Sequence, residues 1–170
     1  MYERILLAYD GSLEGAIALR EGALLAKRCC AKVFLLSVVD ESGGMLMAEA
    51  AYGGAVAHQI DTYKAVLERG CQRLRQLGLD PVAKLVQGEP APAIGAVARQ
   101  IDADLVVVGH HKKNPIARWW SGSTRAQVSD HLNCSVLIAR MQISDEEFAA
   151  ELEKANRVAK VQEEATTAKA

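Results

Sequence analysis

The sequence predicts an α/β protein with a doubly wound, Rossmann-like parallel sheet, and two patterns support this class. Five short apolar runs occur within the first 140 residues, and each is separated from the next by a segment with helical periodicity. The runs are continuously apolar rather than alternating, which is typical of parallel strands covered on both faces. They span residues 4–9, 32–39, 82–86, 104–108 and 135–139. Strands that alternate with helices in this way favour one doubly wound sheet.

The segments between the runs carry helix boundary signals. Ser12 can cap a first helix, with Glu14 in its first turn opposing the helix dipole. The apolar residues of this helix are expected to share one face: Leu13, Ala16, Ile17, Leu24 and Ala26. The later helices are bounded by turn and cap residues: Gly78 ends the second, Pro90 and Pro92 begin the third, and Gly122, Ser123 and Thr124 begin the fourth.

Two segments lie outside this alternation. Residues 41–57 are rich in Gly, Ala and Met, which suggests an excursion over the strand ends. A capping box of Ser144 and Glu147 begins a C-terminal helix, whose apolar stripe is Phe148, Leu152, Ala155 and Ala159, with fraying expected after residue 162. Because this stripe is thin, we predict a domain at 4–140 and a helical, partly disordered tail at 141–170. The alternative is a dedicated partner-binding helix.

Composition limits the classes of function. The net charge of −1 over 170 residues gives no long-range attraction for nucleic acid or anionic lipid. No apolar run reaches the ~18 to 20 residues that span a bilayer, and the N-terminus lacks the basic flank of a secretory signal. The four cysteines show no metal or redox spacing, so ordinary thiols are expected. We therefore expect a cytoplasmic protein whose partners are recognised locally.

Unusual residues gather where the predicted strands end. Asp10-Gly11-Ser12 follows the first strand, Val38 closes the second, and Gly109 follows the fourth. Between residues 105 and 129 there is no acidic residue, while Lys112, Lys113, Arg118 and Arg125 are basic. Ligands of parallel sheets bind outside these strand ends, and glycines with hydroxyls at a helix start suit an anion. The alternatives are a tight turn with a helix cap and a solvated basic loop.

These motifs resemble the universal stress protein family. The resemblance rests on Ala8-Tyr9-Asp10-Gly11-Ser12, on Gly88-Glu89-Pro90, and on the run 104–109 that leads to Gly122-Ser123-Thr124. It implies a five-stranded sheet ordered 3-2-1-4-5, and a homodimer in which Val136, Leu137 and Ile138 of the last strand pair with a second copy. It also implies that Asp10, Gly11, Ser12 and Val38 lie near an adenine nucleotide or its magnesium, with Gly109, His110, Lys112, Gly122, Ser123 and Thr124 around ribose and phosphates.

The chain departs from the ATP-binding pattern of this family at Lys112, where a second glycine is expected. Some family members without this glycine do not bind ATP. A Cβ at position 112 can obstruct phosphate approach or a positive φ, whereas the lysine charge can replace the lost contact. Weakened binding and a different anion remain alternatives.

The sequence thus favours a non-catalytic, nucleotide-responsive stress regulator that binds ATP or AMP, with magnesium as a possible companion at Asp10. It contains no phosphate loop of the G-x4-G-K type, no G-x-G-x-x-G and no G-x-S-x-G. Adjacent side chains on an extended loop point apart, so His110 and His111 are not expected to act as a catalytic pair. The alternative function is a homodimeric protein-interaction module without nucleotide, and slow ATP hydrolysis ranks third.

Overall fold

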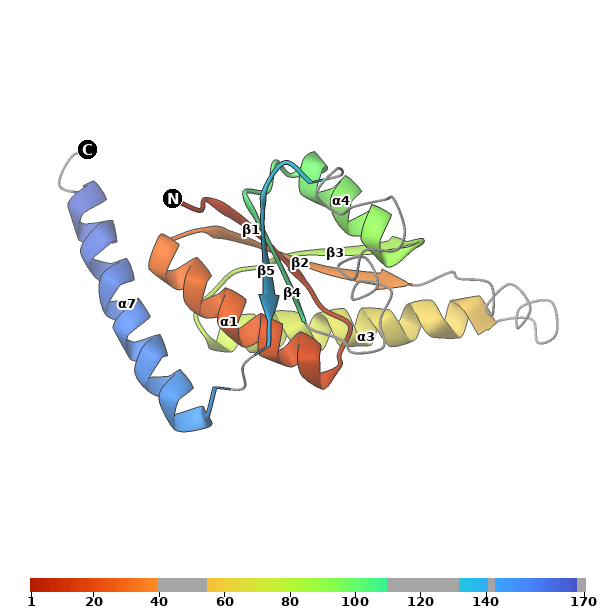
Figure 1. The fold of residues 1–170 in the computed structure, drawn as a ribbon. Coiled ribbons are helices and arrows are strands. Elements are labelled where there is room, and N and C mark those ends of the chain that lie inside the picture. Colours follow the sequence, from red (N-terminus) through yellow and green to blue (C-terminus); the bar gives the residue numbers. More distant parts are fainter. Residues whose placement is uncertain (40–54, 110–131, 141–142, 168–170) are drawn as a thin grey trace.

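The structure is a computed structural model that describes residues 1–39, 55–109, 132–140 and 143–167. Its elements alternate between strands and helices through most of the chain (Figure 1). In chain order they are β1 (Arg4–Ala8), α1 (Leu13–Cys29), β2 (Lys32–Val39), α3 (Ala55–Gln76), β3 (Val82–Gln87), α4 (Pro90–Gln100), β4 (Leu105–Gly109), β5 (Ser135–Ala139) and α7 (Asp145–Thr167).

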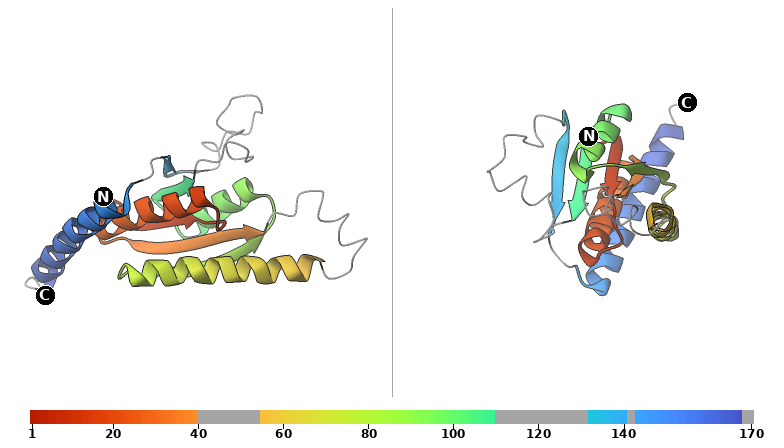
Figure 2. Two further views of the ribbon diagram at one scale, coloured as in Figure 1. Left: turned by 90° about the horizontal axis from the view of Figure 1, so that it is seen from below. Right: turned by 90° about the vertical axis from the view of Figure 1, so that its right-hand side faces the viewer.

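The five strands form one parallel sheet in the order β3-β2-β1-β4-β5, which confirms the predicted class and strand order. β1 is the central strand, and its Leu6 pairs in register with Phe34 on β2 and with Val106 on β4. α1 and α3 cover one face of the sheet and α4 covers the other (Figure 2). The carboxyl ends of all strands therefore meet at one edge of the sheet.

The continuous apolar runs are explained by the two covered faces. Ile5 and Leu7 on β1 face the core beneath α1 and α3, whereas Leu6 between them faces the core beneath α4. All three side chains are at most 1 % exposed. Successive strand residues point to opposite faces, so a central strand of this sheet needs an apolar residue at every position.

The described helix boundaries follow the predicted signals with one difference, at the start of α3. Gly78 adopts a φ of +74° and its N–H donates to the Arg75 carbonyl, so it closes α3 as expected. Pro90 occupies the first turn of α4. α3 begins at Ala55, so residues 55–57 are helical rather than part of the expected excursion, and the rest of that excursion lies outside the described residues. The fourth predicted helix also lies outside them, apart from Leu132, which is buried.

The predicted apolar face of α1 is wrong in part: Leu24 and Ala26 are buried as expected, but of the five predicted residues only Ala26 is a buried residue of the side that faces the sheet. Leu13 is 65 % exposed, and the buried side of the helix is instead built mainly from small residues: Gly15, Ala18, Leu19, Gly22, Ala23 and Ala26. Glycine and alanine let the helix backbone approach the sheet closely. Gly22 illustrates this, because a Cβ there would lie 2.3 Å from Cδ2 of Leu7. Large apolar residues therefore did not mark the side that faces the sheet.

α7 adds a third layer outside α1 (Figures 1 and 2). The capping box is confirmed, since the Glu147 N–H donates to Ser144 Oγ and the Ser144 N–H donates to Glu147 Oε2. Phe148 and Ala155 are buried. The helix runs to Thr167, beyond the expected point of fraying. None of the helices in the described part of the chain has the length and apolar character to cross a membrane.

Arg20, Leu24 and Arg28 form the outer stripe of α1, one helical turn apart. Arg20 pairs with Asp145 of α7, and Arg28 pairs with Glu151 of α7. Leu24, between them, is only 6 % exposed although it lies away from the sheet-facing glycines. We infer that α7 covers Leu24, so the tail is anchored more firmly than its own thin stripe indicated.

Candidate functional site

The turn after β1 holds the first candidate residues in a defined geometry. Asp10 Oδ1 accepts hydrogen bonds from the Ser12 N–H (3.0 Å) and from Ser12 Oγ (2.5 Å). Ser12 Oγ in turn accepts from the Gly15 N–H at 2.9 Å, which confirms Ser12 as the cap of α1. Gly11 adopts a φ of +81°, a backbone conformation that favours glycine. The aspartate therefore fixes the turn that presents the N-terminus of α1 at the strand ends.

Gly109, at the end of β4, lies directly against this N-terminus. A Cβ at Gly109 would lie 2.5 Å from the Glu14 carbonyl oxygen and 2.9 Å from the Gly15 nitrogen. A Cβ at Gly15 would lie 2.6 Å from Asp10 Oδ1. Contacts this short with backbone atoms exclude any larger residue without movement of the chain. The structure thus brings together the predicted site residues of the adjacent strands β1 and β4.

Val38 lies at the end of β2, on the neighbouring side of β1. Its side chain is half-buried and packs on the core beneath α4, and its register partner on β3 is Val86. The next residue, Val39, accepts a hydrogen bond from the Gly88 N–H at 3.0 Å. Gly88 leads into α4, and a Cβ there would meet no heavy atom within 4 Å. This part of the strand edge is more open than the contact at Gly109.

Tyr9 links the candidate turn to the interior, and sequence reasoning missed its role. Its side chain is 4 % exposed, and its backbone carbonyl accepts a 2.6 Å hydrogen bond from Ser37 Oγ. Its hydroxyl accepts from Arg73 on α3 at 3.2 Å. A tyrosine directly before Asp10 was the available signal, but its partners are 28 and 64 residues away in the chain. Hydrogen bonds from β2 and α3 therefore hold Tyr9, the residue directly before Asp10, in place.

The remaining predicted residues divide into two groups. His110, Lys112, Gly122, Ser123 and Thr124 lie outside the described residues. Val136, Leu137 and Ile138 lie on β5, the edge strand next to β4, and each is half-buried. Among the residues that the structure describes, no three His, Cys, Asp or Glu side chains come together as a metal site. The described half of the site is thus a backbone cradle built on Asp10, Gly11, Ser12 and Gly109.

The fold is that of a family of small α/β proteins. The family model of the universal stress proteins matches residues 1–140, and the chain belongs to this family. A Staphylococcus haemolyticus protein assigned to the same family is 27 % identical over 154 residues, which cover 89 % of this chain and 92 % of the relative.

Solved structures share the fold. The universal stress protein UspA from Lactobacillus plantarum is 25 % identical, with a TM-score of 0.65 over 82 % of this chain and 98 % of its own. Three others are complexes: a universal stress protein with cAMP, one from Archaeoglobus fulgidus with dAMP, and one from Arabidopsis thaliana with AMP. Their identities are 23, 22 and 17 % and their TM-scores 0.61, 0.60 and 0.56. They cover 83, 82 and 85 % of this chain and 99, 98 and 94 % of their own.

Proposed function

We propose that this chain is a non-catalytic, nucleotide-responsive stress regulator that binds an AMP-type or ATP-type ligand at the carboxyl ends of β1 and β4. The observation that carries the proposal is the backbone contact between Gly109 and the first turn of α1. This contact brings the carboxyl ends of β1 and β4 together at the N-terminus of α1. A helix N-terminus favours an anion, because its backbone N–H groups and the helix dipole both attract negative charge. The complexes of related folds with cAMP, dAMP and AMP support an adenine nucleotide as the ligand class.

The described residues suit different parts of such a ligand. Val38 offers a half-buried apolar surface for the base, and we propose that the sugar and phosphates lie beside the backbone of Gly11 and Gly109. Mg²⁺ is commonly held by one or two carboxylates together with substrate phosphates, so Asp10 fits a magnesium-bound triphosphate. We propose that Asp10, Gly11 and Ser12 lie near the nucleotide or its magnesium, as the family resemblance implies. His110, Lys112, Gly122, Ser123 and Thr124 would complete the site around the ribose and phosphates. A cytoplasmic location stays a prediction of the sequence.

Titration calorimetry with AMP, cAMP and Mg-ATP tests the proposal. We expect saturable heat for at least one nucleotide, and weaker binding in Asp10→Ala because the turn and any magnesium contact are lost. Asp80→Ala is the matched control: it removes an exposed carboxylate that precedes β3, at the opposite edge of the sheet, and should bind as the native chain does. Absence of heat for all three nucleotides with folded protein would contradict nucleotide binding.

Substitution of Lys112 distinguishes two effects of this residue on nucleotide binding, obstruction by its Cβ and attraction by its charge. If the backbone must approach phosphates closely, Lys112→Gly should strengthen Mg-ATP binding by removing the Cβ. If the lysine contributes a charged contact, the same change should weaken binding by about 1 to 2 kcal/mol. We expect the gain, and a loss measured in the same titration would assign Lys112 to the ligand.

The second candidate is a homodimeric interaction module without nucleotide. β5 is an edge strand whose unpaired backbone groups invite pairing, and Val136, Leu137 and Ile138 carry no charge that would prevent it. We propose that a second copy pairs there. Light scattering at micromolar concentration should give a dimer mass that Leu137→Lys reduces, and a monomeric native protein would reject the dimer. If denaturation of freshly purified protein releases nucleotide, the nucleotide-responsive regulator is favoured. If it releases none, the interaction module is favoured.

A further inference from the structure

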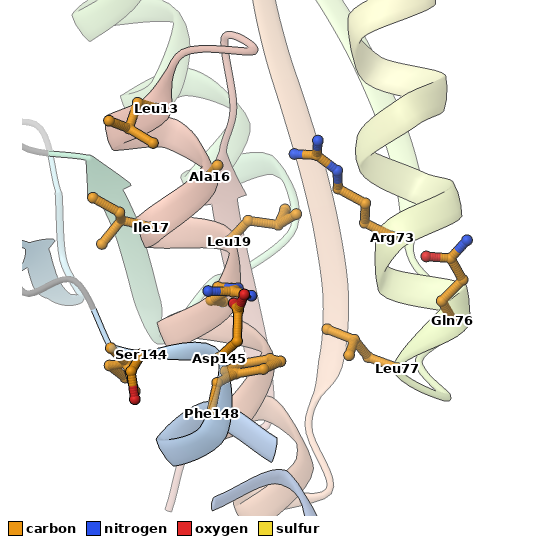
Figure 3. Close-up of a pocket in the computed structure, with 12 residues that line it drawn as sticks. Leu13, Ala16, Ile17, Leu19, Arg73, Gln76, Leu77, Ser144, Asp145 and Phe148 are labelled. Carbon is orange, nitrogen blue, oxygen red and sulfur yellow. The ribbon is translucent and has the colours of Figure 1, made fainter.

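A cavity of about 800 Å³ lies away from the strand ends, between α1, α3 and the start of α7 (Figure 3). Leu13, Ile17 and Leu19 line it from α1, Leu77 lines it just after the end of α3, and Phe148 lines it from α7. Neither Asp10 nor Gly109 lines it. A volume of this size with mostly apolar walls falls within the usual range of small-molecule sites, roughly 300 to 1,000 Å³.

Arg73 supplies the distinctive charge of this cavity. Its side chain extends from α3 toward α1 across the cavity (Figure 3), and one guanidinium nitrogen donates to the Tyr9 hydroxyl at 3.2 Å. Within the described ranges, the Arg73 guanidinium forms no ion pair. The other arginine of the lining, Arg20, instead pairs with Asp145 and lies over the Phe148 ring at 4.7 Å. Arg73 therefore places a permanent positive charge beside an apolar wall.

We propose that this cavity binds an amphipathic carboxylate, with its carboxylate on Arg73 and its apolar chain along Leu19 and Leu77 toward Phe148. A guanidinium with one N–H used by Tyr9 keeps enough donors for a two-bond contact with a planar carboxylate. The chain of such a ligand replaces water on the apolar walls of both helices. A small inorganic anion would leave the apolar walls exposed to water, and a cation would be repelled by the positive charge of Arg73.

α7 forms part of the site, because Ser144, Asp145 and Phe148 at its start line the cavity. A bound chain that contacts Phe148 should therefore stabilise the docked position of α7. Neither Asp10 nor Gly109 lines the cavity, so failure of this proposal and failure of nucleotide binding are distinguishable: octanoate should bind equally well with and without AMP or Mg-ATP.

The test uses the full chain with labelled Leu, Ile and Val methyl groups, titrated with octanoate and followed by NMR. We expect saturable shifts at the methyl groups of Leu19 and Leu77. Octylamine, with the same chain and opposite charge, and acetate, with the charge and no long chain, should bind at least about ten-fold more weakly. Equal affinity for octanoate and octylamine, or shifts that lie outside this cavity, would overturn the proposal.

Variants assign the charge contact. Arg73→Gln should weaken octanoate binding by about ten-fold, and Arg73→Lys should lie between it and the native chain, because lysine keeps the charge without the planar fork. Arg75→Gln removes another exposed arginine of α3, one that pairs with Glu68 and does not line the cavity, and should stay within about two-fold of native. Arg73→Gln binding with native affinity would refute the assignment to Arg73.

Discussion

The two sides of α1 are packed by different means. On the side toward the sheet, glycines leave no room for a Cβ: Gly109 lies against the backbone of α1, and Gly22 lies against the Leu7 side chain. On the outer side, long side chains of α1 meet α7 through two ion pairs and a stacked Arg20 and Phe148. A contact between backbones cannot adjust to added volume, whereas a contact between exposed long side chains can rearrange. The inner side should thus control global stability and the outer side only the docking of α7.

The largest expected effect is that of Gly109→Ala. The new Cβ would lie 2.5 Å from a backbone carbonyl oxygen, so α1 or β4 must move. We expect a loss of about 2 to 3 kcal/mol in the free energy of unfolding, measured by urea denaturation. Gly22→Ala is the comparison, because its closest contact is the end of the Leu7 side chain and alanine favours helix by about 1 kcal/mol. A larger loss in Gly22→Ala than in Gly109→Ala would reverse this ranking.

Phe148→Ala tests the outer side. Truncating a buried phenylalanine in a core lowers the free energy of unfolding by about 3 to 5 kcal/mol. If α7 undocks while the rest of the domain stays folded, the loss for Phe148→Ala cannot exceed the free energy with which α7 docks. We expect hydrogen exchange of the α7 amides to become fast, while the thermal midpoint of the domain falls by only a few degrees. Ala150→Ser, on an exposed position of α7, is the control. Cooperative loss of the whole domain would show that α7 belongs to the core.

The two helix caps offer a matched pair. Ser12→Ala removes the acceptor of the Gly15 N–H and the donor to Asp10, and should cost about 1 kcal/mol of global stability. Ser144→Ala removes the equivalent acceptor of the Glu147 N–H and should increase exchange in the first turn of α7 only. Equal effects of both variants on urea denaturation would contradict the difference between the two sides of α1.

The smallest effect is a pH dependence of α7 docking. Hydrogen bonding from Lys154, with the nearby charge of Arg28, lowers the pKa of Glu151 below its ordinary 4.5. A carboxyl with a depressed pKa in the folded state stabilises that state above the ordinary value, and this contribution is lost as the pH falls through the lowered pKa. Because Lys154 lies on α7 itself, only the contribution of Arg28 depends on docking. We therefore expect the Leu24 methyl resonances to shift toward an undocked state as the pH falls below the ordinary carboxyl value of 4.5, and Arg28→Gln to reduce this change. Resonances that stay constant from pH 6 to about 3 would contradict it.

The sequence alone determined the parts of this protein that depend on local pattern. Apolar runs covered on both faces predicted the strands, and Ser12, Gly78 and Pro90 marked helix ends because capping and φ restriction act within a few residues. The Asp10-Gly11-Ser12 turn was also local, and its position after β1 made it a candidate at the edge where parallel strands end. The motifs that resembled a known family added the strand order, which the pairing of β1 with β2 and β4 confirms.

Only the tertiary structure decided which surfaces meet. The fit of Gly109 to Glu14, the bonds of Tyr9 to Ser37 and Arg73, and the ion pairs of Arg20 and Arg28 with α7 all join residues far apart in the chain. Helical periodicity placed Leu24 with Ala26 on one face, but it could not show that glycines and alanines faced the sheet while α7 covered the opposite side. Periodicity reports the hydrophobicity of a side chain, whereas packing depends on the distance between backbones, which is set by partners that the local sequence does not contain.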